Sequence, residues 1–236
     1  MFDRNLLFGL GAFAAIGFVT APVDPASALS VRTVYNGTSV TVADNGVGDT
    51  DPTVDRVSYD GTGNAAFNDF STLNVLGFIC TGCVNRLGFN PAVQSAGVVD
   101  DLVLLVSDTG FSTGNDNPLL FESDFAGIKG NVDVTYETFW DGSDSLFAET
   151  NLVAQSTLSG NAGADFDTIT GGNGGNPFSM TIKLTFGQTG WGNIGQPTVE
   201  PDAQLRASAV PVPAALPLMA GALGVFGLVR ARRRAA

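Results

Sequence analysis

Apolar and polar residues alternate with a period of two along several segments of this chain. Between residues 180 and 186, four apolar residues are separated by three polar ones, and a similar alternation runs through residues 132–140. Successive side chains of a β-strand point to opposite faces of the sheet. Each segment therefore predicts a strand with one buried face and one polar face.

Two further segments, residues 31–35 and 39–43, flank the dipeptide Asn36-Gly37. Both residues tolerate positive φ, which the tight turn of a β-hairpin requires. Asp141-Gly142 predicts a similar reversal after Trp140. Residues 102–106 are apolar at every position, which favours a strand buried on both faces, although periodicity alone leaves a short helix open.

Turn-rich segments of Gly, Asn, Asp, Ser and Thr separate these strands, at residues 44–52, 109–118 and 160–177. No helical pattern of the length that a parallel α/β sheet needs between its strands is present. We therefore predict an all-β fold, a single antiparallel β-sandwich that is jelly-roll-like, over residues 29–209. Residues 187–209 leave two possibilities open, a last strand near 204–209 or a linker.

The N-terminal 28 residues have the organisation of a secretory signal peptide. Arg4 stands in a short n-region, residues 6–19 are apolar, and Ala26 and Ala28 form a small-x-small cleavage site. Cleavage after Ala28 starts the mature chain at Leu29. The alternative is an uncleaved N-terminal anchor, but the apolar run is short for a bilayer, which takes about 20 residues.

A second apolar segment, residues 214–229, reaches the length of a transmembrane helix, about 20 residues, when it is extended back to Val210. Four arginines follow it: Arg230, Arg232, Arg233 and Arg234. Arginines beside a membrane span stay in the cytoplasm, which places the residues before Val210 outside it, in agreement with a signal peptide. The alternative is a buried C-terminal helix with a basic tail.

The C-terminal segment also contains the proline motif Val210-Pro211-Val212-Pro213-Ala214, ahead of the Gly-containing apolar segment and the arginines. This combination resembles the PEP-CTERM sorting signal of the VPLPA type, from which the chain departs at Val212, where Leu is usual. The resemblance implies a Gram-negative source, processing by exosortase, which is a membrane cysteine protease, and an association with exopolysaccharide and biofilm matrix.

On this resemblance, residues 210–236 are a sorting signal made of the proline motif, a transmembrane helix and the arginine cluster. The protein is then exported across the inner membrane, anchored there transiently and delivered to the cell surface or the extracellular space. Residues 107–111, Ser-Asp-Thr-Gly-Phe after a buried strand, look like the corresponding part of other PEP-CTERM cargo domains, whose biochemical role is mostly unassigned.

Composition narrows the range of functions. The chain has no His among its 236 residues, which excludes a Ser-His-Asp triad, His-ligated zinc and a His general base. Without the two terminal signals, the 23 acidic and 11 basic side chains become 21 and 6, a formal charge of −15 for residues 29–209. Such a surface repels nucleic acid and anionic lipid, so we expect no nucleic-acid partner.

Cys80 and Cys83 are the two cysteines of the chain. In an oxidising compartment they predict a small disulfide loop after the apolar residues 75–79. The alternative of a thioredoxin-like redox site lacks the βαβ context and the helix N-terminus that lower a thiol pKa. Structural zinc needs further ligands that the sequence does not supply.

Two groups of acidic residues are candidate calcium ligands, because Ca²⁺ prefers hard carboxylate and carbonyl oxygens. The first group is Asp44, Asp49, Asp51 and Asp55, and the second is Asp108, Asp116, Glu122 and Asp124. Neither has the EF-hand spacing, and residues 171–178 resemble only one copy of a calcium-binding nonapeptide repeat. The alternative is a set of solvated acidic turns. We predict no other cofactor.

Candidate catalytic groups are few. Residues 110–114 match the nucleophile elbow Gly-x-Ser-x-Gly, but that motif needs a His base and a strand-turn-helix setting, and the sequence has neither. Paired carboxylates hydrolyse glycosides without His, at a separation of roughly 5 to 10 Å that only the tertiary structure sets. Glu122, Glu137 and Glu149 are candidates for such a pair.

The leading hypothesis is an exported, exosortase-sorted β-sandwich that serves as a structural, non-enzymatic component of the cell surface or extracellular matrix. The alternative is a carbohydrate-binding module in which Ca²⁺ offsets the repulsion between the acidic domain and an acidic exopolysaccharide. A weaker alternative is a polysaccharide-processing glycosidase. Exposed aromatic side chains on a concave sheet face would favour either carbohydrate hypothesis over the structural one.

Overall fold

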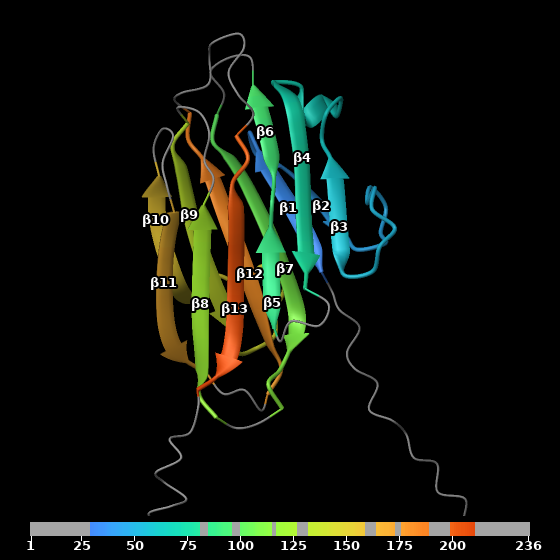
Figure 1. The fold of residues 1–236 in the computed structure, drawn as a ribbon. Helices are drawn as coiled ribbons and strands as arrows, with labels where there is room; N and C mark the ends of the chain where they lie inside the picture. The colour runs from blue at the N-terminus through green and yellow to red at the C-terminus, as the bar shows by residue number, and fades with distance from the viewer. Residues whose placement is uncertain are drawn as a thin grey trace, which may run out of the picture.

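The computed structural model describes residues 29–80, 85–95, 100–114, 117–126, 132–158, 164–172, 176–188 and 199–210. These residues form two antiparallel β-sheets that face each other (Figure 1). Sheet A has the strand order β10 (Asn151–Leu158), β9 (Val134–Asp141), β12 (Phe178–Phe186), β7 (Leu102–Phe111), β1 (Ser30–Tyr35) and β2 (Thr38–Ala43). The predicted all-β antiparallel sandwich is confirmed.

Sheet B lies in front of sheet A in Figure 1. Its strand order is β11 (Ala164–Gly171), β8 (Leu119–Ala126), β13 (Asp202–Ala209), β5 (Arg86–Phe89), β4 (Phe70–Ile79) and β3 (Arg56–Asp60). A further strand, β6 (Ala92–Ser95), pairs with β4 beside β5. A single turn of 3₁₀ helix, η1 (Ala65–Phe67), precedes β4.

Several strands form where the sequence predicts them. The β1–β2 hairpin turns at Asn36 and Gly37, whose φ values of 49° and 75° are those of the tight turn that matches strand twist. Strand β7 runs between β12 and β1, and its side chains at Leu102, Leu104 and Val106 are fully buried. The apolar run therefore forms a central strand and no helix.

The structure corrects the expected turn at Asp141-Gly142 and decides between the two alternatives for the last residues of the domain. Asp141-Gly142 does not close a tight hairpin, because residues 142–150 separate β9 from β10 before the two strands pair. Residues 202–209 form a strand, β13, which lies in the middle of sheet B between β8 and β5. For these residues the linker alternative is wrong.

The core between the sheets is rich in aromatic side chains. At one end Tyr35 packs edge-on against Phe70, with ring centroids 4.9 Å apart. In the middle, Phe125 of sheet B stacks on Tyr136 of sheet A at 4.5 Å. Burial of these rings removes a large apolar area from water and holds the two sheets together.

The predicted cleavage site at Ala26 and Ala28 lies outside the described residues, as does the predicted sorting signal beyond Val210, namely Pro211, Val212, Pro213, Ala214, Arg230, Arg232, Arg233 and Arg234. The N–H of Val210 donates a hydrogen bond to the carbonyl of Pro118 at 2.9 Å, which continues the β13–β8 pairing. Over the described ranges, no helix has the length and apolar character to cross a membrane.

Candidate functional site

The segment that joins β9 to β10, residues 142–150, packs on part of the outer face of sheet A, and we call it the strap. The N–H of Phe147 in the strap donates to Ser107 Oγ on β7 at 2.9 Å. Ser179 Oγ on β12 donates to the strap carbonyl of Ser145 at 2.7 Å. Ser107 and Thr181 are consequently buried, although their side chains point away from the core.

The strap also supplies partners to the cations of sheet A. The Arg32 guanidinium lies 4.0 Å from the centre of the Phe147 ring, a cation–π contact. Lys183 Nζ lies 2.8 Å from Glu149 in the strap and 3.3 Å from Glu137 on β9. Although burial lowers the pKa of Lys183, the two carboxylates raise it above its ordinary value overall.

No described segment crosses the outer face of sheet B (Figure 1). Strand register places six residues directly beside one another on this face, and side chains in register point to the same side of a sheet. From edge to edge, this row is Phe166, Asp124, Gln204, Gly88, Phe78 and Arg56. Strands β8, β13, β5 and β4 thus contribute to the middle of one surface, although β8 and β13 lie far from the other two in the sequence.

An aromatic ring lies over a glycine at the centre of this row. A Cβ built on Gly88 would lie 2.3 Å from Cζ of Phe78, closer than any real contact. The missing side chain at Gly88 therefore makes room for the Phe78 ring, which is partly exposed. An aromatic ring over a strand glycine is also a way to cover the exposed backbone at that position.

The neighbouring row of sheet B carries two arginines. Arg206 on β13 lies directly opposite Arg86 on β5, and Glu122 lies on the other side of Arg206 on β8. The guanidinium groups of both arginines donate through Nη2 to the same oxygen, Oε1 of Gln204. Arg206 Nη2 also lies 3.6 Å from Asp124 Oδ2.

The core supports this surface from behind. The hydroxyl of Tyr136, on β9 of sheet A, reaches across to the backbone carbonyls of Asp124 at 3.3 Å and Gln204 at 3.2 Å. It also bonds to Ser123. Burial raises the pKa of Tyr136 far above its ordinary value, so the hydroxyl stays protonated and remains a donor. The backbone under Gln204 and Asp124 is thereby fixed.

We call the surface formed by Phe78, Gly88, Arg86, Gln204, Arg206 and Asp124 the platform. It combines an aromatic ring with an amide, two guanidinium groups and a carboxylate, all planar groups on rigid strands. A sugar ring offers C–H groups on its faces and hydroxyls around its rim, so an aromatic ring and planar hydrogen-bonding groups suit it. Sites built on strands are also more precisely held than sites on loops.

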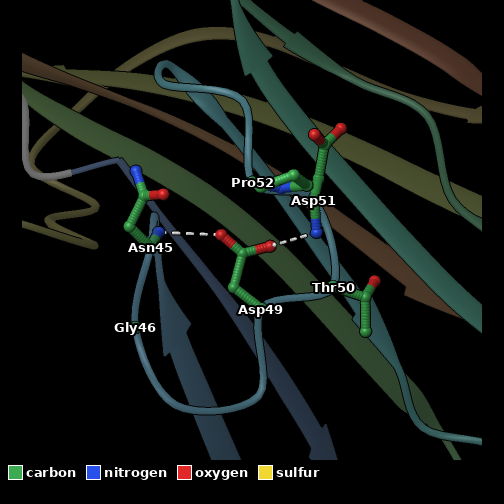
Figure 2. A pocket seen from close by; sticks show the side chains of 6 residues that line it. All are labelled: Asn45, Gly46, Asp49, Thr50, Asp51 and Pro52. Atoms are coloured by element: carbon green, nitrogen blue, oxygen red, sulfur yellow. Dashed lines mark hydrogen bonds between the residues drawn. The ribbon is translucent and has the colours of Figure 1, made fainter.

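The first predicted acidic group lies in the loop between β2 and β3, where two of its members, Asp49 and Asp51, line an open pocket (Figure 2). Asp49 accepts hydrogen bonds from the backbone N–H groups of Asn45 at 2.8 Å, Asp51 at 3.0 Å and Ser58 at 2.9 Å. Its carboxylate is therefore directed at the loop's own backbone.

The other members of this group also organise the loop. Asp44 Oδ2 accepts from the N–H of Asp55 at 2.9 Å, and Asp51 pairs with Arg56 at 3.0 Å. Hydrogen bonds from Thr53 lower the pKa of Asp51. These contacts are those of structural acidic turns, and within the described residues no three acidic or thiol side chains converge as metal ligands.

The second acidic group does not come together in the fold. Asp108 is buried on the inner side of β7, whereas Glu122 and Asp124 lie on the outer face of sheet B. Asp116 lies outside the described residues. The spacing of these residues along the chain therefore does not translate into a shared site.

The three candidate glycosidase carboxylates are divided between the two outer faces. Glu137 and Glu149 share Lys183 on sheet A, and Glu122 lies on sheet B beside Arg206. Cys80 is disulfide-bonded, and its predicted partner Cys83 lies outside the described residues.

Sequence reasoning missed the platform. The relevant signal is the alternation of Ala203, Leu205 and Ala207, which are buried, with Gln204 and Arg206, which point outward. Alanine contributes little to a hydrophobic periodicity, so the strand is inconspicuous. Nothing local indicates that Phe78 lies over Gly88 or that Arg86 meets Arg206, because strand register creates both contacts.

No protein-family model and no curated protein matches this chain. Among solved structures, partial similarity is found to the carbohydrate-binding module TmCBM61 in complex with β-1,4-galactotriose (TM-score 0.33, 7% identity, 69% of this chain and 92% of that chain). It is also found to the N-terminal cellulose-binding domain of Cellulomonas fimi β-1,4-glucanase C (TM-score 0.29, 12% identity, 66% and 90%).

A further partial match is the enzymatically active domain of bacteriophage CBA120 tailspike protein 4 (TM-score 0.33, 8% identity). It covers 79% of this chain, but this chain spans only 20% of the tailspike chain. TM-scores this low establish neither a shared fold family nor a shared ligand.

Proposed function

We propose that this protein is a polysaccharide-binding component of the cell surface or extracellular matrix, and that it binds through the platform on sheet B. The observation that carries the proposal is the Phe78 ring over Gly88, in register with Gln204 and beside Arg86 and Arg206. We prefer this proposal to the purely structural hypothesis, because the structural hypothesis gives no role to the outward-facing groups of the platform.

The outer face of sheet A is a poorer candidate for the same role. Its cations are already engaged by Phe147 and Glu149 of the strap. The loop pocket between β2 and β3 is also poorer, since its carboxylates bond to their own loop. The platform is the surface whose polar groups lie on rigid strands and face outward.

The route to the cell surface is part of the proposal. A signal peptide ending at Ala28 starts export, and exosortase recognises the proline motif that begins at Val210. A membrane helix holds the chain until processing. Replacing Pro211 and Pro213 by Ala in the native host is expected to leave a longer, membrane-retained species, and unchanged mass and release would contradict exosortase sorting.

The binding proposal is tested by calorimetric titration of the full-length protein with the exopolysaccharide of its host, in a detergent without sugar groups. Saturable heat is expected for the wild type. Phe78→Ala is expected to weaken binding about tenfold or more, because stacking on an aromatic ring contributes on the order of 1 kcal/mol or more. Leu152→Ala removes an exposed apolar side chain from sheet A and serves as the control.

A chelator arm tests the role of calcium. The platform supplies its own hydrogen-bond donors and acceptors, so we expect binding to survive chelation. Binding that is lost with chelator and restored by Ca²⁺ would point to the acidic loops. A wild-type protein that binds no polysaccharide in either condition would overturn the proposal.

A further inference from the structure

Two arginines on the platform lie directly opposite each other on neighbouring strands. Arg86 on β5 and Arg206 on β13 are register partners, and like charges placed directly opposite destabilise a sheet. Residues 29–209 contain 6 basic side chains against 21 acidic ones. A cross-strand arginine pair in so acidic a domain needs a specific reason.

The hydrogen bonds of this pair are incomplete. Both guanidinium groups converge on one neutral acceptor, Gln204 Oε1. The Nε atoms of Arg86 and Arg206 are buried from solvent, and neither has a hydrogen-bond partner among the residues that the structure describes. Each guanidinium has five N–H donors in a fixed fork that matches a carboxylate. The amide oxygen of Gln204 thus occupies the position that an anionic oxygen would fill better.

We infer that Arg86 and Arg206 form a subsite for the carboxylate of a uronic acid unit in the bound polysaccharide. This inference rests on the proposed function and deepens it. The ligand carboxylate displaces the Gln204 amide and accepts charge-assisted hydrogen bonds from both guanidinium groups. The carboxylate replaces a neutral acceptor by an anionic one, so that both partners of each hydrogen bond are charged and a bidentate geometry becomes possible.

The position of Phe78 fits the same ligand. Its row, with Gly88 and Gln204, lies two residues along the strands from the row of Arg86 and Arg206, which is about 7 Å. The long arginine side chains cover part of this distance, so a sugar ring at Phe78 and a carboxylate at the arginines belong to one uronate unit or to neighbouring units of the same chain. Ring and carboxylate are then recognised together.

Two carboxylates oppose an anion at this place. Glu122 lies opposite Arg206 in register, and Asp124 lies opposite Gln204, 3.6 Å from Arg206. No ion pair joins Glu122 to Arg206 among the described residues. The platform is therefore not a general basic patch, and recognition depends on direct contact with the arginine pair. This arrangement favours spaced carboxylates on a sugar chain over dense polyanions.

The test compares polygalacturonate with the neutral galactan that carboxyl reduction makes from it, titrated against the full-length protein. The wild type is expected to bind the uronate polymer about tenfold more tightly than the reduced polymer. Arg86→Gln and Arg206→Gln are expected to abolish this preference, because affinity for the uronate polymer falls by a larger factor than affinity for the reduced polymer. Arg32→Gln, which removes the same charge from sheet A, is expected to keep the preference.

A second variant fills the subsite from within the chain. Gln204→Glu places a carboxylate between the two arginines and is expected to remove the preference, while the protein stays folded by circular dichroism. Wild-type protein that binds both polymers equally would overturn the uronate subsite and leave the proposed function standing. Wild-type protein that binds the host exopolysaccharide but neither of these polymers would overturn the uronate subsite alone, and wild-type protein that binds none of the three would overturn both proposals.

Discussion

The outer face of sheet A and the outer face of sheet B both carry cations, but these cations have different partners. On sheet A, the strap supplies an aromatic ring to Arg32 and a carboxylate to Lys183. On sheet B, Arg86 and Arg206 share one neutral oxygen of Gln204. Within the described ranges, the chain supplies charged or aromatic partners to the cations of sheet A and leaves the two arginine Nε atoms of sheet B without a hydrogen-bond partner.

This difference shows why the charge of the whole domain is a poor guide to binding. A formal charge of −15 led to the expectation that an acidic glycan needs bridging calcium. On the proposed platform two arginines meet at one place, and we expect short-range contacts with them to outweigh the screened long-range field of the domain. The strap on sheet A provides a comparison within the same protein. Its Glu149 gives Lys183 a carboxylate, which is the group that we propose a ligand gives to the arginines on sheet B.

The largest expected change comes from detaching the strap. Ser107 Oγ accepts a hydrogen bond from the N–H of Phe147 and donates one to the backbone carbonyl of Met180 at 3.0 Å. Ser107→Ala is expected to lower the free energy of unfolding by about 2 kcal/mol, because it leaves partly buried backbone groups without a partner. Urea denaturation measures this change.

The matched control for that variant lies on sheet B. Ser208 is partly exposed on the outer face of β13, and Ser208→Ala is expected to change the free energy of unfolding by less than about 0.5 kcal/mol. Equal losses for the two variants would contradict the structural role assigned to the strap.

The next change compares the cations of the two faces directly. Lys183→Met leaves Glu137 and Glu149 without their shared counterion, and we expect a loss of up to about 1 kcal/mol in unfolding free energy for these partly exposed pairs. Arg86→Met relieves a like-charge pair and is expected to be neutral or to stabilise by about 0.5 kcal/mol. If both variants destabilise equally, sheet B is as complete as sheet A.

Acid is expected to weaken sheet A through Asp141, which holds the first turn of the strap. Hydrogen bonds from Ser143 and Ser145 at 2.5 and 3.3 Å stabilise its carboxylate, and chiefly the Ser143 bond lowers its pKa below the ordinary 3.8. A lowered folded-state pKa contributes stability above the unfolded value, and this stability is lost as pH falls through the folded value.

Asp141→Asn isolates this contribution from that of the other carboxylates. The variant is expected to be less stable than the wild type at pH 6, and to lose less stability than the wild type between pH 6 and pH 3. Urea midpoints at the two pH values measure both effects. Parallel losses in the two proteins would show that Asp141 does not contribute to the acid sensitivity.

Local signals predicted much of the fold. Asn36-Gly37 determines its own turn, and alternation along 180–186 determines which side of β12 faces the core, so both are readable from a few neighbouring residues. The same alternation was misleading for the other side of β12. Alternation places Lys183 on the polar face of β12 and so predicts a solvated lysine, but the strap brings Glu149 to it. The sequence does not show that residues 142–150 fold back over sheet A.

The candidate site could not be predicted from local patterns either, because it also depends on contacts between distant segments. Gln204 lies far along the chain from Arg86 and Asp124, and only the order of β8, β13 and β5 in sheet B brings the three together. The acidic groups illustrate the opposite error, since Asp108 and Asp124 are near in sequence but lie on different sheets. Proximity along the chain is a poor substitute for register in an antiparallel sandwich.

The smallest expected change in stability comes from the centre of the platform, where we expect a clear change in binding. In Gly88→Ala the new Cβ would occupy the place of Phe78 Cζ, so the ring must move. The loss of ring packing opposes the gain of about 0.5 kcal/mol or more that alanine brings to a strand, and the net change is expected within about 0.5 kcal/mol. Polysaccharide affinity is expected to fall about tenfold, as in Phe78→Ala. Unchanged affinity would mean that the ring does not contact the ligand, because Gly88→Ala displaces Phe78 without removing it.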